Sequence, residues 1–215
     1  TNVIEKSLNT GAAFAERQTG HDTFLEYLKR FGFDEQSGID LPGELKGDLG
    51  RLTERGAPAV AFATASYGQG VAATPREMLN AVAAIANGGI LMRPFVNADL
   101  GPQEIRRVIS PGTAKQVTEM MVSAVDKADV AKISGYTVAG KTGTAQIPGR
   151  GGYTEEVVHT YIGFGPTAHP RFIILLKLDK PAGAPLAGTT VVPAFRDLAQ
   201  FILGYMNIPP DRLAK

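Results

Sequence analysis

The feature that most constrains this chain of 215 residues is the run at positions 139–146, which reads Ala-Gly-Lys-Thr-Gly-Thr-Ala-Gln. Tyr136, Thr137 and Val138 lead into the run with strand propensity. An edge strand of this composition offers backbone hydrogen bonds, a fixed cation and hydroxyls to an extended anionic ligand, and Gly143 lets the ligand backbone approach closely. The run therefore predicts an edge strand that binds an anionic ligand.

A second group of polar residues lies near the start of the sequence, where Ser7 and Asn9 flank Leu8. A serine and an asparagine two positions apart in a loop can place two polar groups side by side, and Lys141 on a strand can reach them across a cleft. Two simpler interpretations stay open at this point. Ser7 and Asn9 suit a helix N-cap and its neighbour, and Lys141 suits a solvated lysine that protects a sheet edge from association.

The run around Lys141 resembles the Lys-Thr-Gly strand of penicillin-binding proteins and serine β-lactamases, whose signature also includes Ser-x-x-Lys and Ser-x-Asn. Its continuation into Thr144, Ala145 and Gln146 is similar to class B penicillin-binding proteins, the monofunctional D,D-transpeptidases of cell division and elongation. Ser7 to Asn9 supplies the Ser-x-Asn element. No serine of the printed sequence has a lysine three residues later, so the element that carries the nucleophile is absent from it.

This resemblance implies a catalytic role for three residues. Ser7 would relay a proton between the leaving amine and the catalytic base, and Asn9 would hydrogen-bond the donor peptide. Lys141 would hold Ser7 and the substrate carboxylate electrostatically. The remaining motif residues would bind substrate.

The substrate-binding residues implied by the resemblance are Thr142, Gly143 and Thr144. The two threonine hydroxyls would bind the substrate carboxylate beside the lysine cation. The backbone N–H of Thr144 would supply half of an oxyanion hole, with the other half coming from the nucleophile's own N–H. The chain by itself is therefore expected to hold much of the substrate cleft without forming an acyl-enzyme.

The fold class expected from the resemblance is α+β, of the β-lactamase and transpeptidase type, with helices packed on an antiparallel sheet. Three strands are predicted, namely the Lys-Thr-Gly strand and residues 159–165 and 171–178, joined as an antiparallel meander. The family sheet has five strands, so two would lie outside this sequence and leave residues 172–176 as an apolar edge. Residues 1–215 are accordingly expected to be part of one transpeptidase domain, truncated at its start.

Several helices are predicted from apolar spacing and capping signals. The first covers residues 12–18, and the next follows a capping box formed by Thr23 and Glu26 and ends at Gly32. Further helices are expected at residues 57–65, after the capping box at residues 74–77, and after Ser110.

Two further segments are predicted near the end of the sequence. A final helix after Pro193 is expected to bury a stripe listed as Phe195, Leu198, Ile202 and Tyr205. Residues 148–152 are expected to form a mobile loop.

Composition excludes several classes of function. A formal net charge of +1 gives no electrostatic case for nucleic acid. The absence of cysteine excludes disulfides and thiol catalysis. His21, His159 and His169 share no metal-ligand spacing, so no metal or other cofactor is expected. Ser66 has no evident base beside it and is not expected to be a nucleophile.

The function implied by the resemblance is peptidoglycan peptide cross-linking through an acyl-enzyme on a serine that this sequence does not contain. The implied partners are peptidoglycan stem peptides, the rest of the domain and, once that is present, β-lactams. The implied location is the cell envelope, on the extracytoplasmic face of the inner membrane. Two alternatives stay open from the sequence: a β-lactamase or D,D-carboxypeptidase of the same fold, and a non-catalytic peptide-binding module.

Overall fold

A computed structural model describes residues 1–184 and 186–212, and the chain divides into two compact units. The first unit consists mainly of residues 3–6 and the chain from Thr118 onward, and the second of residues 7–117. The boundary falls inside helix α6 (Pro111–Ala128). The expectation that residues 1–215 form part of one transpeptidase domain stays a prediction.

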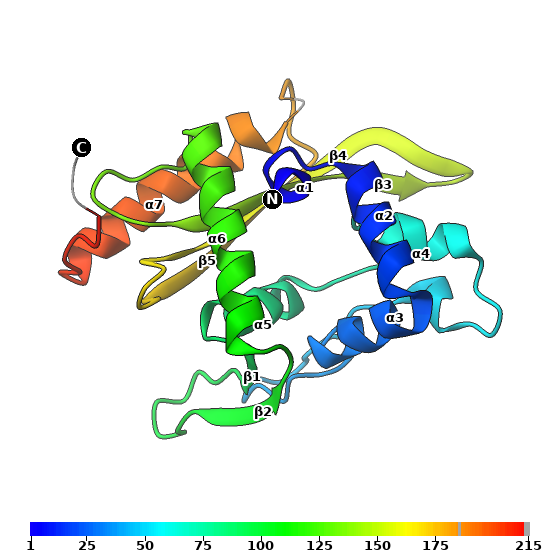
Figure 1. Ribbon diagram of the computed structural model, residues 1–215, viewed down its shortest axis with the longest axis horizontal. Helices are drawn as coiled ribbons and strands as arrows, with labels where there is room; N and C mark the ends of the chain where they lie inside the picture. The colour runs from blue at the N-terminus through cyan, green and yellow to red at the C-terminus, as the bar shows by residue number, and fades with distance from the viewer. Residues whose placement is uncertain (185, 213–215) are drawn as a thin grey trace. The chain divides into compact units, whose positions relative to one another are not determined.

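The first unit is built on an antiparallel sheet in the strand order β3-β4-β5, which confirms the predicted meander. Its strands are β3 (Ala139–Gly149), β4 (Gly152–Gly165) and β5 (Phe172–Asp179). Among the described residues β3 pairs only with β4, so the Lys-Thr-Gly run lies on an edge strand as expected. Figure 1 shows the hairpin of β3 and β4 extending past β5.

The turn between β3 and β4 is tighter than the sequence suggests. Gly149 pairs directly with Gly152, so the expected loop over residues 148–152 is reduced to a tight turn, and its mobility stays a prediction. Gly151 takes a φ of 91°, in the left-handed region that glycine adopts without strain. A register shift between Gln146 and Pro148 accommodates the proline, which cannot donate to the ladder.

Helix α7 (Val191–Tyr205) covers one face of this sheet by packing on β4 and β5 (Figure 1). The stripe predicted for it is only partly right, because Leu198 is 39% exposed and Tyr205 is 77% exposed. The helix is apolar on more than one side, so periodicity alone did not identify the packed face. The buried face consists of Val191, Val192, Phe195, Ala199 and Leu203.

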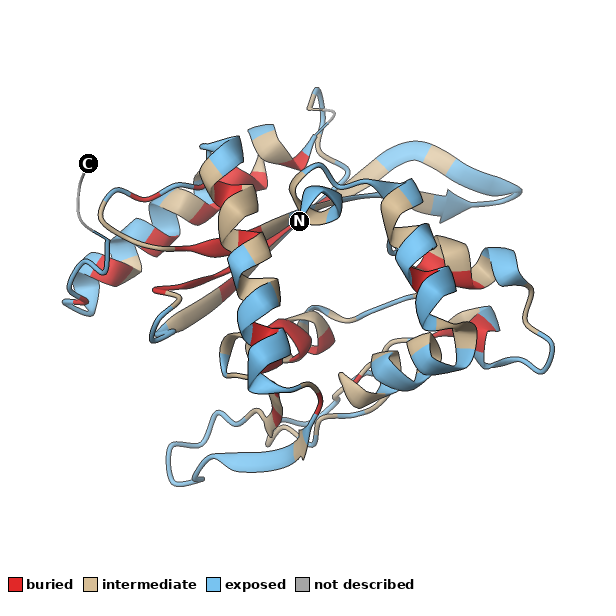
Figure 2. Ribbon diagram, in the orientation of Figure 1, coloured by how far each residue is buried: buried red, intermediate tan, exposed pale blue. Residues whose placement is uncertain are grey.

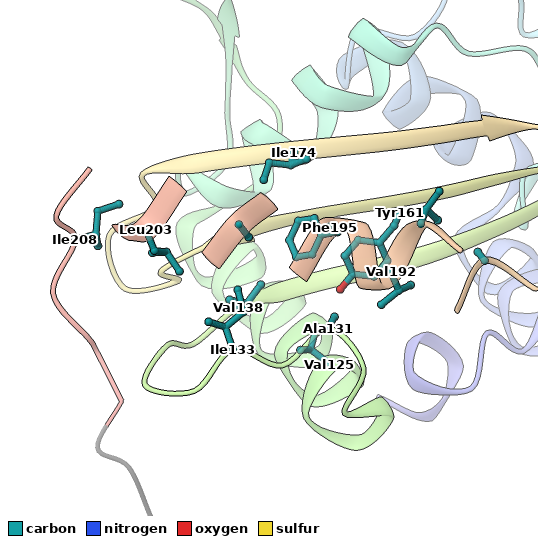
Figure 3. Close-up of a cluster of buried hydrophobic side chains, with 13 residues drawn as sticks. Val125, Ala131, Ile133, Val138, Tyr161, Ile174, Val192, Phe195, Leu203 and Ile208 are labelled. Carbon is teal, nitrogen blue, oxygen red and sulfur yellow. The ribbon is translucent and has the colours of Figure 1, made fainter. Parts of the chain in front are cut away.

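The core of the first unit lies between this sheet and the helices that cover it (Figure 3). Tyr161 on β4 packs against Phe195 of α7, with ring centroids 4.6 Å apart. Val125 of α6 and the segment that follows the helix complete the cluster. Helix α1 (Asn2–Glu5) is tied to α6, because Ser123 and Lys127 both donate to the Glu5 carboxylate.

The second unit is mainly helical. Its elements in chain order are α2 (Asn9–Thr19), α3 (His21–Arg30), η1 (Gly50–Thr53), α4 (Ala59–Ala65), α5 (Pro75–Ala86), β1 (Ile90–Arg93) and β2 (Gln103–Arg107). The last two form an antiparallel pair, in which β2 is polar and mostly exposed. Phe62 and Leu52 centre one small core, and Leu91 and Val108 another.

Two helix starts in this unit contrast. Thr74 and Glu77 form the predicted capping box at the start of α5, with Pro75 following the cap. The predicted box at Thr23 and Glu26 is wrong, because α3 begins earlier, at His21, and Gly20 is its N-cap. Gly20 has a φ of 88°, which sets the chain direction without a side-chain cap.

None of the helices among the described residues is both long and apolar enough to cross a membrane. Figure 2 shows where burial is concentrated: in the inner part of the sheet and in the helix faces that pack together.

Candidate active site

The predicted substrate-binding run occupies the start of β3, where the strand is paired with β4 along its length. Lys141 lies opposite Ile162, Thr142 opposite Tyr161, and Thr144 opposite His159. Lys141 is half-buried, whereas Thr142 and Thr144 are exposed. The strand thus presents the hydroxyls of Thr142 and Thr144 to solvent, whereas the neighbouring Lys141 is partly shielded from water.

The Lys141 ammonium folds back along its own strand. It donates to the Thr142 carbonyl oxygen at 2.7 Å and lies 3.4 Å from the Thr142 hydroxyl. Burial lowers the pKa of Lys141 below its ordinary value, because the surroundings disfavour the charged form. A cation held in this way is oriented before any ligand arrives.

Gly143 serves the packing of the hairpin as well as any approach by a ligand. A Cβ atom at this position would lie 2.4 Å from the Thr160 hydroxyl oxygen on β4. A larger residue would therefore push β3 away from its partner strand. This contact gives a reason within the fold for glycine in the motif.

Ser7 and Asn9 lie at the start of α2 in the second unit, and both are exposed. The interpretation of Ser7 as a helix N-cap is wrong, because Leu8 occupies the N-cap position and no side chain caps the helix. Ser7 instead has a φ of 49°, a conformation uncommon outside glycine and often found at functional sites. The approach of Ser7 and Asn9 to Lys141 stays a prediction, because these residues belong to different units.

The residues that the sequence set aside have local roles. Ser66 donates to the Ala63 carbonyl oxygen at 2.7 Å. His21 stacks on Phe62 and bonds to Glu16, and His159 is buried with its Nδ1 atom 2.9 Å from the Thr190 hydroxyl. Among the described residues no cluster of His, Asp or Glu could hold a metal ion.

The structure adds one residue that the sequence did not single out. Tyr161 lies beside the Lys-Thr-Gly run and is 3% exposed. Its place could have been found only from the register of β3 on β4, and the irregularity near Pro148 hides that register from the sequence.

These features agree with known proteins. Residues 1–200 match the family described as the penicillin binding protein transpeptidase domain. The chain therefore belongs to this family. The match runs through both the Ser-x-Asn and the Lys-Thr-Gly elements.

Curated relatives carry related names. Stage V sporulation protein D of Bacillus subtilis is 34% identical, over 98% of this chain and 35% of that protein. The probable peptidoglycan D,D-transpeptidase PbpC of Pseudomonas aeruginosa is 30% identical, over 99% of this chain and 38% of that protein. The chain thus spans little more than a third of the length of these relatives.

Solved structures share the fold. The transpeptidase domain of Burkholderia pseudomallei penicillin-binding protein 3 superposes with a TM-score of 0.86 at 29% identity, covering 98% of this chain and 65% of that one. Penicillin-binding protein 3 of Mycobacterium tuberculosis, complexed with ampicillin, gives a TM-score of 0.84 at 29% identity, covering 97% and 51%. The α+β fold predicted from the sequence is therefore confirmed.

Proposed function

We propose that this chain is the substrate-holding part of a peptidoglycan D,D-transpeptidase, whose acyl-forming serine lies outside the printed sequence. The observation that carries the proposal is the edge strand β3, which pairs with β4. On this strand the half-buried Lys141 is followed by the exposed hydroxyls of Thr142 and Thr144. The Ser-x-Asn element within the same family match supports it. No contact among the described residues favours a β-lactamase or a carboxypeptidase over a transpeptidase.

In this proposal Lys141 and the hydroxyls of Thr142 and Thr144 bind the carboxylate of the substrate peptide. A lysine already oriented by the Thr142 carbonyl loses little conformational freedom when the anion binds. Ser7 relays the proton to the leaving amine, and Asn9 holds the peptide backbone of the donor. The acyl bond forms on the serine of a Ser-x-x-Lys element.

The proposed partners are peptidoglycan stem peptides, which end in a free carboxylate, and β-lactams, which mimic them. Mycobacterium tuberculosis penicillin-binding protein 3 has been solved with ampicillin and with aztreonam. The proposed location is the cell envelope, on the extracytoplasmic face of the inner membrane. The proposed roles are in cell division or cell shape.

The first arm of the test measures covalent labelling. The chain is incubated with a fluorescent penicillin and its mass is determined. We expect no adduct, because the activated serine is absent from the sequence. An acyl group on Ser7 or Ser66 would contradict the assignment of the nucleophile.

The second arm measures reversible binding of a peptide that ends in D-Ala-D-Ala, by amide chemical shifts in NMR. We expect shifts at Thr142 and Thr144, and their loss in Lys141→Ala. Lys177→Ala is the matched control, because Lys177 is an exposed lysine on β5 of the same sheet. Equal weakening in the two variants would show that Lys141 has no specific role in binding.

A further inference from the structure

The residue that faces the backbone of β3 just before Lys141 is Tyr161. A Cβ atom built on Gly140 would lie 1.9 Å from the Tyr161 hydroxyl oxygen and 2.5 Å from the ring carbon that bears it. Real Cβ atoms do not approach other atoms so closely. The tyrosine therefore occupies the space that any side chain at position 140 would need.

Tyr161 is itself held from the other side. Its ring packs against Phe195, whose centroid is 4.6 Å away at an interplanar angle of 57°. Phe195 is fully buried, and its ring in turn fills the space beside Gly163, where a Cβ atom would lie 2.6 Å from it. The phenol ring is thus clamped between helix α7 and the backbone of β3 (Figure 3).

Tyr161 is one of the residues that line a small pocket in the first unit. The pocket has a volume of about 100 Å³, and its lining includes Glu5, Gly140, Lys141 and Thr142 as well as Tyr161. The hydroxyl has no hydrogen-bond partner among the described residues. Burial raises the pKa of Tyr161 above its ordinary value, so the phenol is neutral near neutral pH.

We propose that Tyr161 is a positioning residue for Lys141 and Thr142, and that it acts through the volume of its ring, which fixes the Gly140 backbone of β3. This inference rests on the proposed function of Lys141 in binding the substrate carboxylate. Tyr161 touches no substrate in this scheme. Its ring and Gly140 lie on one face of the β3–β4 pairing, whereas the Lys141 side chain leaves β3 on the other face. Tyr161 therefore acts on Lys141 through the backbone of the strand.

The Tyr161 hydroxyl makes no hydrogen bond with the described residues, which indicates that the ring, and not a bond from the hydroxyl, positions the strand. A hydroxyl without a partner fixes no direction, whereas a clamped ring resists displacement of the strand because interiors are close-packed. Phenylalanine at position 161 should therefore preserve the arrangement. A smaller aliphatic residue should not.

The test reads Lys141 directly, by NMR titration of its side-chain Cε–Hε signals in the full chain labelled with ¹³C-lysine. Lys141→Arg assigns the signal by removing it. In Tyr161→Leu we expect the midpoint of the Lys141 titration to move up toward that of the exposed lysines, because water reaches the ammonium. In Tyr161→Phe we expect the wild-type midpoint.

Phe164→Leu is the matched control. Phe164 lies on the same strand and is fully buried, but it pairs with Ala139 and is not part of the pocket that contains Lys141. We expect it to lower the midpoint of urea unfolding while leaving the Lys141 titration in place. If it shifts Lys141 as far as Tyr161→Leu does, the effect is general loosening of the sheet and the proposal fails.

A double-mutant cycle adds a second measurement. Gly140→Ala should shift Lys141 in the wild-type background, because its methyl group collides with the phenol. It should add nothing in Tyr161→Ala, where the space is open. Additive effects would overturn the proposal.

A measurement on the unmodified chain guards against variants that do not fold. We expect a nuclear Overhauser effect between the ring protons of Tyr161 and the α protons of Gly140, and its absence would overturn the proposal. None of these readouts uses a peptide or a β-lactam. These readouts can thus fail while the proposed function stands, so failure of the positioning role and failure of the proposed function are distinguishable.

Discussion

The hairpin of β3 and β4 and the long loop over residues 34–49 are held in place by different means. In the hairpin, glycines let aromatic rings and the partner strand approach the backbone, as at Gly140 and Gly163. In the loop, buried carboxylates accept backbone N–H groups. Packing fixes the first region and hydrogen bonds to anions fix the second, so the two should respond to different perturbations.

Glu77 is the main anchor of the loop. Its side chain is buried, and its two oxygens accept from the backbone N–H groups of Asp34, Gly47 and Thr74 at 2.7–3.0 Å. Glu44 adds a second anchor by accepting from the backbone N–H groups of Ser37 and Gly38. The Glu77 carboxylate thus ties both ends of the loop to the start of α5.

The largest effect should come from Glu77→Ala. It removes the acceptor for three backbone donors in a buried place, and we expect a loss of about 3–5 kcal/mol in the free energy of unfolding. Urea denaturation measures it. Glu26→Ala is the control, because Glu26 is exposed on α3, and that variant should stay within about 0.5 kcal/mol of wild type. Similar losses in both variants would show that the Glu77 carboxylate does not anchor the loop.

A smaller loss should follow from Gly163→Ala in the hairpin. The added methyl group would lie 2.6 Å from the Phe195 ring and 2.8 Å from the Ala139 carbonyl oxygen. We expect a loss of about 1–3 kcal/mol, of the size typical of overpacking. Gly204→Ala in α7 meets nothing within 4 Å and should stabilise the chain slightly. A tolerated Gly163→Ala would show that close approach does not hold the hairpin.

The smallest effect concerns pH. Burial by itself would raise the pKa of Glu44, but hydrogen bonds from Ser37 and Gly38 and the charge of Arg76 outweigh it and hold the pKa below its ordinary value of 4.5. The stability that Glu44 contributes is therefore complete above that value and is lost as pH falls toward the lowered one.

Amide exchange at Ser37 and Gly38 measures this response. We expect protection to fall with acid in the wild type and to be low at every pH in Glu44→Gln. Amides of the β3–β4 pairing in the same samples are the internal reference and should keep their protection over this range. If the amides of the hairpin lose protection together with those of the loop, both regions open in one unfolding event, and the proposed difference between them is wrong.

The sequence was informative where one residue type decides a local structure. The capping box at Thr74 and the edge strand around Lys141 were both predicted, because each depends on neighbours in the chain. The role of Tyr161 and the bonds that Glu77 accepts from Asp34 and Gly47, beyond its place in the capping box, were not predicted, because they depend on contacts between separate segments. The face of α7 was misjudged for a related reason: an apolar helix has several candidate faces, and the sheet selects one.

Strand β3 continues past the last residue of β4 that pairs with β5. Of the residues of β4 that have a partner on β5, Val158 lies nearest the hairpin turn, and it pairs with Ala145 of β3. Up to that position the ladder is three strands wide, and beyond it only two strands remain, largely open to water (Figure 2). Two-stranded ribbons are marginally stable by themselves, so the outer hairpin can fray and re-form at low free-energy cost. Lys141 to Thr144 lie just on the wide side of this border, which insulates the cation and the hydroxyls from opening events at the tip.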